Sequence, residues 1–414
     1  MVSIRNQIGE TSPMSPALTR WITLLLAITS AMAVATVYFA QPLLESMAAD
    51  LGVAQQKIGW VVGATQAGYA LGLLLIVPLG DLIDRKRLLL GQLLFSALAL
   101  AGVGMAPNWA LLLLALAITG LMAVMVQVMV AHAASLAAPG QQGQAVGTVT
   151  SGIVLGILLA RLVSGGLADL AGWRSVYLFT AGLLMLLALV LWRSLPVGQP
   201  VSLRSGYRAL IVAQFRLYRH DRLLRQRGLF GVLIFAAFSV LWSAMVMPLS
   251  AEPLELSHTA IGLFGLAGVA GTLAAARAGR LADQGLGERT TGVALILLVL
   301  SWLPTAFVGH SLMAFGLGVL MLDFAVQAVH VTNQSLLLAG RGAMASRLIG
   351  AYMCCYSLGS GVGAVLASWV YAHWGWAAVC GLGMGISAVA LGYWLWLQRA
   401  RAAEAALQCS GQNL

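Results

Sequence analysis

The chain has 414 residues, of which 60% are hydrophobic and only 9% are charged. Soluble globular domains are usually about 45–50% apolar and about 25% charged. A chain of this length with so few charged side chains cannot cover a surface that faces water. The composition therefore excludes a soluble enzyme, a disordered protein and a secreted disulfide scaffold, and it indicates an integral membrane protein. The net charge of +10 does not by itself indicate nucleic-acid binding. Its meaning depends on where the Lys and Arg residues fall relative to the apolar runs.

Apolar runs long enough to cross a bilayer recur along the whole chain. A membrane-crossing helix needs roughly 20 mostly apolar residues, and runs of this length form helices rather than barrel strands. The sequence predicts an all-α membrane protein with twelve crossings. These crossings lie at about 21–44, 58–79, 88–106, 109–137, 147–168, 175–195, 228–248, 260–278, 290–308, 312–339, 348–371 and 376–397.

The positions of the basic residues predict how the chain sits in the membrane. If the N-terminus is cytoplasmic, twenty of the 23 Lys and Arg residues fall on the cytoplasmic side, only Lys57 and Arg174 fall outside, and Arg161 alone falls in the middle of a crossing. This bias predicts that both termini are cytoplasmic. The expected parts are an N-terminal tail (1–20), a six-helix bundle (21–195), a basic linker (196–227), a second bundle (228–397) and a C-terminal tail (398–414). We expect the linker to set orientation, with a regulatory role as the alternative.

The two halves of the chain repeat each other with an offset of about 200 residues. The pattern G-x-L-x-D follows both the second and the eighth crossing. Matches in three separate places predict two parallel six-helix repeats. They pair Gly80, Leu82 and Asp84 with Gly279, Leu281 and Asp283, Gln127 and Ser135 with Gln327 and Ser335, and Gly172-Trp173 with Gly375-Trp376.

Glycine is concentrated in the second, fifth, eighth and eleventh crossings. Small residues let helix backbones approach closely, so every third helix is suited to a contact that can move. Ordinary tight packing is the alternative. We predict that these helices form the interface between the halves, with Gly152, Gly156, Gly359 and Gly363 as interface glycines.

The loop after the second crossing carries the pattern G-x-L-x-D-R-x-R, and the fifth crossing carries Gly152 and Gly156 four residues apart. With twelve crossings, a six-plus-six repeat and a basic central loop, the chain resembles the major facilitator superfamily, and within it the bacterial drug- and metabolite-efflux branch. The resemblance covers essentially the whole chain. It implies two pseudo-symmetric halves, a monomer in the bacterial plasma (inner) membrane, and a central cavity lined by helices one, four, seven and ten.

Charged residues of the repeated loops are candidates for a conformational latch. A carboxylate at a helix end can cap a facing helix, while arginines can hold carbonyl ends or lipid phosphates. The alternative is that these charges only set orientation. The predicted latch consists of Gly80, Asp84, Arg85 and Arg87, with Gly279, Asp283 and Arg289 as its weaker counterpart.

The tenth crossing carries the strongest set of polar candidates. Asp323, Gln327, His330 and Gln334 fall within an arc of roughly 60° on a helix, which is too polar a stripe to face lipid. Asp323 is the only acid at mid-depth in any crossing, and intramembrane ionisable groups are usually functional. We predict that Asp323 is the proton-coupling carboxylate. The alternative is a charge pair with Arg161 that only holds the fold.

Arg161 lies near mid-depth in the fifth crossing, about fourteen residues from its start at 1.5 Å per residue. It is a candidate for holding an anionic substrate, pairing with Asp323 or adjusting a protonation site, and bonding to neighbouring carbonyls is the alternative. Other groups that could line the cavity are His132, for which hydrogen-bonded packing is the alternative, with Gln127, Gln41 and Tyr38. The tryptophans fall mostly near crossing ends, as interface anchors do.

These features favour a secondary transporter that exports a small organic molecule in exchange for protons by alternating access. The alternative is a proton-coupled uptake symporter for a small anion held by Arg161. An enzyme is not expected because no HExxH, GxSxG, Walker or paired-carboxylate motif occurs, and a receptor is not expected because no polar segment exceeds the linker. The four cysteines predict apolar packing rather than a metal site, and no cofactor or nucleic-acid partner is expected.

Overall fold

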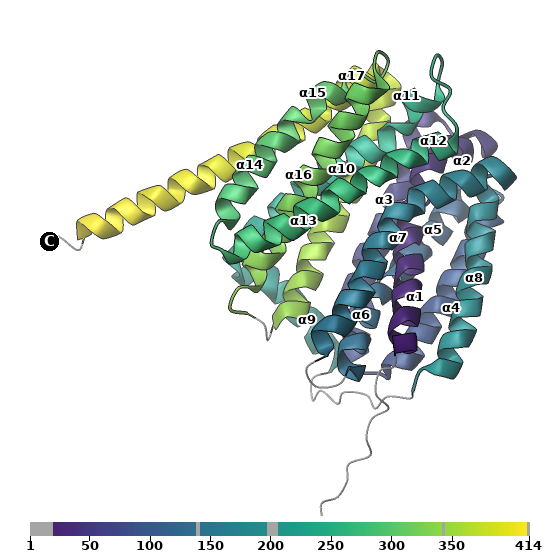
Figure 1. Cartoon of the computed structure of the whole chain (residues 1–414), viewed down its shortest axis with the longest axis horizontal. Helices are drawn as coiled ribbons and strands as arrows, with labels where there is room; N and C mark the ends of the chain where they lie inside the picture. Colours follow the sequence, from purple (N-terminus) through teal and green to yellow (C-terminus); the bar gives the residue numbers. More distant parts are fainter. Residues whose placement is uncertain (1–19, 138–140, 197–205, 342–343, 412–414) are drawn as a thin grey trace, which may run out of the picture.

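The computed structural model describes residues 20–137, 141–196, 206–341 and 344–411. Two groups of helices lie side by side, one from each half of the chain (Figure 1). The predicted N-terminal tail up to residue 19, and parts of the linker and of the C-terminal tail, lie outside the described residues. The all-helical class expected from the sequence is confirmed for the described part of the chain.

The first half contains eight α-helices and three short 3₁₀ turns among the described residues. Asn108 begins one of these helices by accepting a hydrogen bond from the backbone N–H of Leu111, which satisfies an otherwise unpaired donor. The elements are α1 (Arg20–Tyr38), η1 (Gln41–Leu43), α2 (Leu44–Asp50), η2 (Gln55–Lys57), α3 (Trp60–Leu75), η3 (Val77–Asp81), α4 (Arg85–Gly104), α5 (Trp109–Ala123), α6 (Met125–Leu136), α7 (Gln142–Ala171) and α8 (Trp173–Ser194).

The linker helix α9 (Tyr207–His220) precedes the second half. The seventh crossing then begins at Arg222, earlier than the predicted 228, because Asp221 caps it by accepting from the N–H of Leu224. The elements of the second half are α10 (Arg222–Ala244), α11 (Val246–Ser250), α12 (His258–Leu263), η4 (Phe264–Ala267), α13 (Gly268–Asp283), α14 (Gly287–Leu300), α15 (Trp302–Thr305), α16 (Leu312–Leu338) and α17 (Ala345–Gly411).

Among the described residues, ten helical segments are long and apolar enough to cross a membrane. One of them, Arg347–Ala403, holds two crossings, because Gly375 has a φ of 72° that interrupts the helix within α17. The shorter helices α14 and α15 together cover most of the residues of the predicted ninth crossing. The twelve crossings expected from the sequence are therefore all present, and the helix of the last one continues into the predicted C-terminal tail as far as Gly411.

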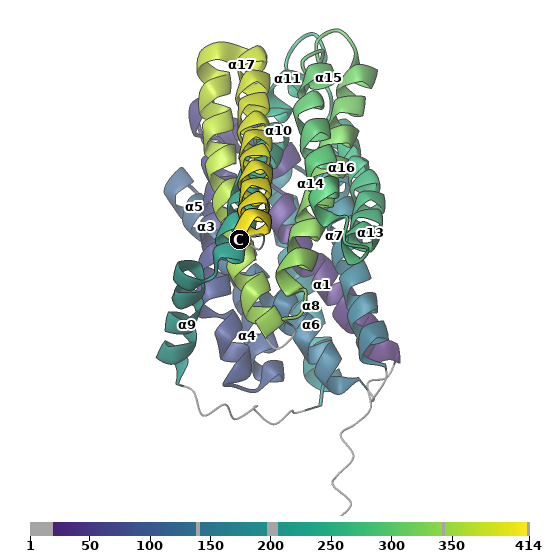
Figure 2. The ribbon, with the colours of Figure 1, turned by 90° about the vertical axis from the view of Figure 1, so that its left-hand side faces the viewer.

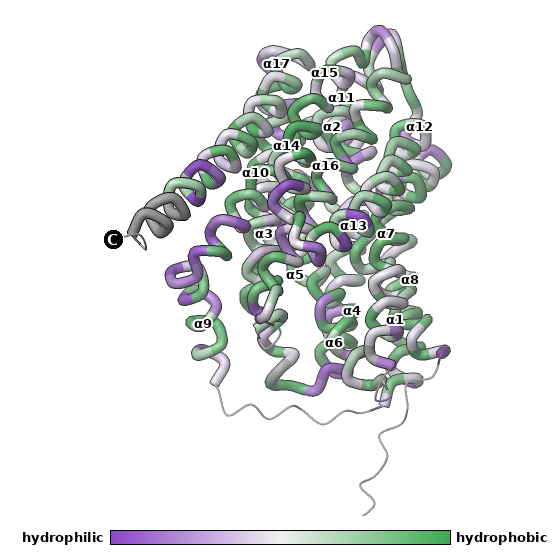
Figure 3. Tube along the Cα trace, turned by 60° about the vertical axis from the view of Figure 1, so that its left-hand side comes forward, coloured by the Kyte–Doolittle hydropathy of each residue, from purple (hydrophilic) through white to green (hydrophobic). Residues whose placement is uncertain are grey.

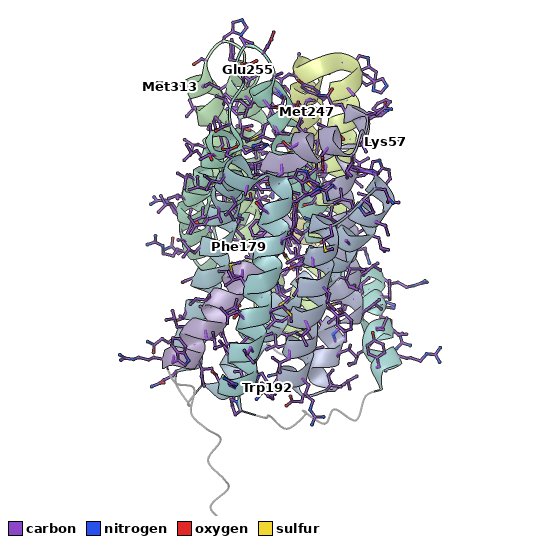
Figure 4. All side chains as sticks on the ribbon, turned by 90° about the vertical axis from the view of Figure 1, so that its right-hand side faces the viewer. Lys57, Phe179, Trp192, Met247, Glu255 and Met313 are labelled. Carbon is purple, nitrogen blue, oxygen red and sulfur yellow. The ribbon has the colours of Figure 1, made fainter. Side chains whose placement is uncertain are left out.

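The two ends of the bundle are distinct. We call the end that holds α9 and the start of α4 the linker end, and the opposite end, with α2 and α12, the far end (Figures 1 and 2). Figure 4 shows Glu255 and Met313 at the far end and Trp192 at the linker end. The tube in Figure 3 is mostly hydrophobic along the crossings, whereas hydrophilic stretches gather at α9 and late in α17.

The glycines predicted to lie between the halves pack within their own half instead. A Cβ added at Gly152 or Gly156 would overlap the backbone of α1 at Ala27 and Ala31, and one added at Gly359 or Gly363 would overlap the backbone of α10. The two halves thus repeat the same close contact, helix five on helix one and helix eleven on helix seven. This supports the predicted duplication and differs from the role predicted for these four glycines.

Two other helix pairs join the halves. In the α3–α17 pair, Gly59 donates its backbone N–H to Ser368 Oγ at 3.0 Å, and a Cβ at Gly59 would overlap the carbonyl oxygen of Ala364. In the α7–α12 pair, a Cβ at Gly262 would lie 2.5 Å from the carbonyl oxygen of Arg161. These contacts lie toward the far end, and α13, α14 and the end of α17 slope away from the first half toward the linker end (Figure 1).

Candidate functional site

Arg161 of α7 is buried at the centre of the molecule, with 2% of its surface exposed. Its guanidinium carbon lies 3.7 Å from the ring centroid of Trp242 and 5.0 Å from that of Tyr38. Its Nε donates a hydrogen bond to Gln41 Oε1 at 2.5 Å, and its Nη2 is buried without a hydrogen-bond partner. Aromatic faces attract a desolvated cation, so this cation is held by rings and one amide rather than by a carboxylate.

Asp323 of α16 contacts the N–H edge of the same tryptophan. It is 4% exposed, and its Oδ1 accepts a hydrogen bond from Trp242 Nε1 at 3.0 Å. Among the ion pairs of the described residues, none joins Asp323 to Arg161. Trp242 therefore contacts both the acid and the base for which the sequence offered a direct pair as the alternative.

A second polar cluster lies farther along α16 toward the linker end. The Nδ1 of His330 lies 3.1 Å from Tyr352 OH, and its Nε2 lies 3.1 Å from Gln334 Nε2. The His330 ring also meets Phe235 edge to face, at 5.0 Å between ring centroids. The predicted stripe of α16 thus faces the interior, but its acid and its histidine have different neighbours.

A tyrosine pair links the two halves at the centre. The hydroxyl oxygens of Tyr38 in α1 and Tyr356 in α17 lie 2.9 Å apart. The ring of Tyr356 also contacts Phe235, with centroids 4.1 Å apart. Tyr38 is therefore shared between the Arg161 cluster and the second half. A gap beside this cluster, too small to hold a water molecule, is lined by Gln41, Pro42, Arg161, Trp242, Met245 and Ile261.

Three other predicted cavity residues lie apart from this centre. His132 of α6 is 3% exposed, and neither ring nitrogen has a hydrogen-bond partner. Gln127 lines a cavity at the linker end together with Arg85 and Arg347. Gln327 packs against α13, where a Cβ at Gly271 would lie 2.9 Å from its Cγ. The structure does not bring these three side chains to Asp323.

The predicted latch residues of the first half bond within that half. Asp84 caps its own helix, α4, by accepting from the N–H of Arg87 at 2.9 Å, and its Oδ2 has no partner. Arg85 donates to the carbonyl oxygens of Gly80 and Ala131 at 3.3 and 3.2 Å. Arg87 is exposed. In this conformation Asp84 does not cap a facing helix of the other half.

The counterpart in the second half has a different charge pattern. Asp283 and Arg289 are exposed, and Gly279 faces Val331 at ordinary contact distance. The ion pairs in this region instead join Glu288 to Arg227 and to Arg401. This network was not predicted from the sequence, because the repeated G-x-L-x-D pattern pointed to Asp283 and Arg289 instead of Glu288.

Trp242 is the central residue that sequence reasoning missed. The tryptophans were expected mostly near crossing ends, yet Trp242 is 1% exposed and contacts both Arg161 and Asp323. Phe235, Phe238 and Trp242 are spaced three and four residues apart, which places them on one face of α10. That aromatic stripe in a predicted cavity-lining helix was the available signal.

Comparisons with known sequences agree on one family. The family model described as Major Facilitator Superfamily matches residues 24–345. YgaY of Escherichia coli strain K12, which is described as an uncharacterized transporter, is 42% identical over 367 residues, which cover 89% of this chain and 92% of that protein. The multidrug resistance protein MdtG of Salmonella arizonae is 31% identical over 272 residues, which cover 64% of this chain and 67% of that protein.

Solved structures with the same fold are also transporters. A bacterial homologue of the human lysosomal transporter Spinster, in an inward-facing unoccupied conformation, has a TM-score of 0.75 at 13% identity and covers 92% of this chain and 96% of its own. The human organic anion transporter MFSD10 has a TM-score of 0.67 at 20% identity, covering 91% and 99%. From its sequence match and its twelve-helix fold, this chain belongs to the major facilitator superfamily of transporters.

Proposed function

We propose that this transporter exports a small organic molecule in exchange for protons, with Asp323 as the carboxylate that gains and loses the proton. The observation that carries the proposal is the environment of Asp323, which is buried between the halves and receives one hydrogen bond from Trp242. An ionised carboxylate at such depth is costly without a paired cation. The gain or loss of a proton there therefore changes the charge of the site, and with it the conformation that is more stable.

The contacts between the halves support alternating access to this site. The α3–α17 and α7–α12 pairs pack backbone to backbone toward the far end, whereas a cavity lined by Gln127, Arg85 and Arg347 lies between the halves at the linker end. A conformation closed at one end and less tightly packed at the other is one of the two that rocking halves require.

The direction of export rests on the sequence relatives and the charge bias. MdtG of Salmonella arizonae carries the name multidrug resistance protein. The distribution of the 23 Lys and Arg residues supports a cytoplasmic location of the linker end and of both termini by the positive-inside rule. With this orientation the cavity lined by Arg85 and Arg347 faces the cytoplasm, where an exporter takes up its cargo.

The first experiment identifies a cargo and then tests coupling. Cells that overproduce or lack the protein are grown on a panel of toxic organic compounds, and compounds whose toxicity changes are added to inverted membrane vesicles that hold a pH-sensitive dye. We expect the compound to release protons from acidified vesicles, and we expect Asp323→Asn to abolish that release. Asp50→Asn is the matched control because Asp50 is a half-exposed carboxylate. Full proton release by the Asp323→Asn protein would refute the proposal.

A second candidate function is proton-coupled uptake of a small organic anion. The specific observation in its favour is Arg161, a buried cation whose Nη2 has no partner. An anion on Arg161 would lie near Asp323, and two negative charges in one desolvated site repel each other. The anion would therefore enter together with a proton. A cation that binds Asp323 would instead compete with the proton and produce exchange, so the sign of proton movement in the vesicles separates the two functions.

A further inference from the structure

Asp169, near the end of α7, receives the beginning of α12 from the other half. Its Oδ1 accepts from the backbone N–H of His258 at 3.1 Å and lies 2.6 Å from His258 Nδ1. Its Oδ2 accepts from the backbone N–H of Thr259 at 2.8 Å and from Thr259 Oγ1 at 2.5 Å. One carboxylate thus holds two consecutive residues of α12 through both their backbone and their side chains.

The same end of α12 is tied to a second element of the first half. The Nε2 of His258 lies 2.6 Å from Ser46 Oγ in α2. Next to it, Ser250 of α11 donates a hydrogen bond to Glu45 of α2. His258 therefore bridges α7 and α2, and the far end is closed by polar contacts that cross between the halves.

Arg161 and Asp169 lie on one face of α7. Arg161, Gly165 and Asp169 are spaced four residues apart, and on α12 and the turn after it His258, Gly262 and Gly265 are spaced four and three apart, so each set faces one way. A Cβ at Gly165 would overlap the carbonyl oxygen of His258, and a Cβ at Gly265 would lie 3.2 Å from Arg161 Cβ. One continuous backbone contact runs from the far end to the central cation.

We infer that Asp169 is a positioning residue that closes the far end and, by holding α12, seats Gly262 and Gly265 against Arg161. Interiors of packed helices switch between discrete arrangements rather than deforming continuously. When α12 leaves Asp169, the far end opens and the packing around Arg161 loosens in the same movement. This inference rests on the alternating-access part of the proposed function and is independent of proton coupling and of the direction of transport.

The chain provides a matched control at the same end. Asp50, also in the first half, pairs with Arg174 at 2.9 Å, and the side chains are 48% and 36% exposed. Both residues belong to the first half, so this pair does not cross between the halves. Removing the Asp50 carboxylate changes the local charge as removal of Asp169 does, but it leaves the contact with α12 intact.

The test measures opening at a site away from the altered residue. Ser368 of α17 is buried in the other contact between the halves, on Gly59. A Ser368→Cys reporter is built in a protein whose Cys354, Cys355, Cys380 and Cys409 are replaced by serine. Intact cells, on whose outer surface we expect the far end, are treated with a membrane-impermeant maleimide. We expect Asp169→Ala to raise the labelling rate about tenfold, as the loss of charge-assisted hydrogen bonds implies, and Asp50→Ala to leave it unchanged.

Two further variants keep the result decisive. Thr259→Val removes one donor to Asp169 and is expected to raise labelling by a smaller factor, so it decides the question if Asp169→Ala protein fails to reach the membrane. Asp169→Glu is expected to restore slow labelling. An unchanged rate in both Asp169→Ala and Thr259→Val would overturn the inference. Faster labelling together with unaltered proton coupling in Asp323→Asn would refute only the coupling role proposed for Asp323.

Discussion

The two ends of this transporter use their polar residues in different ways. At the far end, Asp169 and Ser368 bond to the opposite half through His258, Thr259 and Gly59. At the linker end, the most conspicuous charges of the sequence bond within their own half, as the capping of α4 by Asp84 illustrates. Charged motifs that are easy to see in a sequence are thus not the residues that hold this conformation closed.

The difference follows from what each contact must do. A contact that closes one end in one conformation must be broken in the other, so it is built from a few hydrogen bonds and close backbone packing between small residues. A charge cluster that stays inside one half moves with it as a rigid body. Substitutions at the far end should therefore change the conformation. Substitutions in the second-half network of Glu288 with Arg227 and Arg401 should change the stability of one bundle.

The largest effect on transport is expected from a side chain added where α12 packs on α7. In Gly262→Ala the new Cβ would lie 2.5 Å from the carbonyl oxygen of Arg161, which is too short for contact, so α12 must move off α7. We expect at least a tenfold loss of transport, since misplacement by about 1 Å can cost on the order of 100-fold, with faster maleimide labelling at Ser368→Cys. Gly147→Ala in α7, the helix on which Gly262 packs, is the control because a Cβ at Gly147 meets nothing within 4 Å.

A large effect on stability, without a change in conformation, is expected from Glu288→Gln. Arg227 is 1% exposed and Glu288 is 30% exposed, and a buried donor that loses its partner costs about 1–3 kcal/mol. Thermal unfolding in detergent should therefore show a clearly lower Tm. Labelling at Ser368→Cys should match the parent protein, because this network lies within the second half. Faster labelling would show that the network also acts between the halves.

An intermediate effect of opposite sign is expected at the linker end. Asn caps a helix about as well as Asp, so Asp84→Asn keeps α4 capped and removes only the charge. If Asp84 latches the linker end in the other conformation, the far-end-open state becomes rarer. We expect labelling at Ser368→Cys to fall about three- to fivefold and transport to fall while the protein level is unchanged. Normal transport at a normal protein level would contradict the latch.

The smallest effect is expected from Asp50→Asn. An exposed ion pair contributes at most about 1 kcal/mol, and Asp50 and Arg174 are both substantially exposed. We expect the Tm, transport and labelling at Ser368→Cys to stay close to those of the parent protein. A change in labelling as large as that of Asp169→Ala would show that charge at the far end, rather than the bond to α12, controls opening.

Much of the site could be predicted one residue at a time but not as an arrangement. Asp323 and Arg161 stand out because charges are rare at membrane depth, and the structure places both at the centre. How Asp323 and Arg161 are arranged around Trp242 could not be predicted from the sequence. Trp242 lies 81 positions from Asp323 along the chain, and the rotation of α10 decides which way its ring points. Asp169 and His258 were missed because they fall at crossing ends, where charged residues are ordinary.

The membrane setting, the twelve crossings and the duplication can be predicted from the sequence, because hydrophobic length and periodic motifs are local properties of a chain. Which small residues meet depends on how the helices pack in three dimensions. Gly152 and Gly363 pack inside their halves, while Gly262 and Gly59 pack between them, although all four lie in crossings that are rich in glycine. Helix identity follows from composition, but helix partners depend on rotation and tilt, which are set by the packing of all neighbours at once.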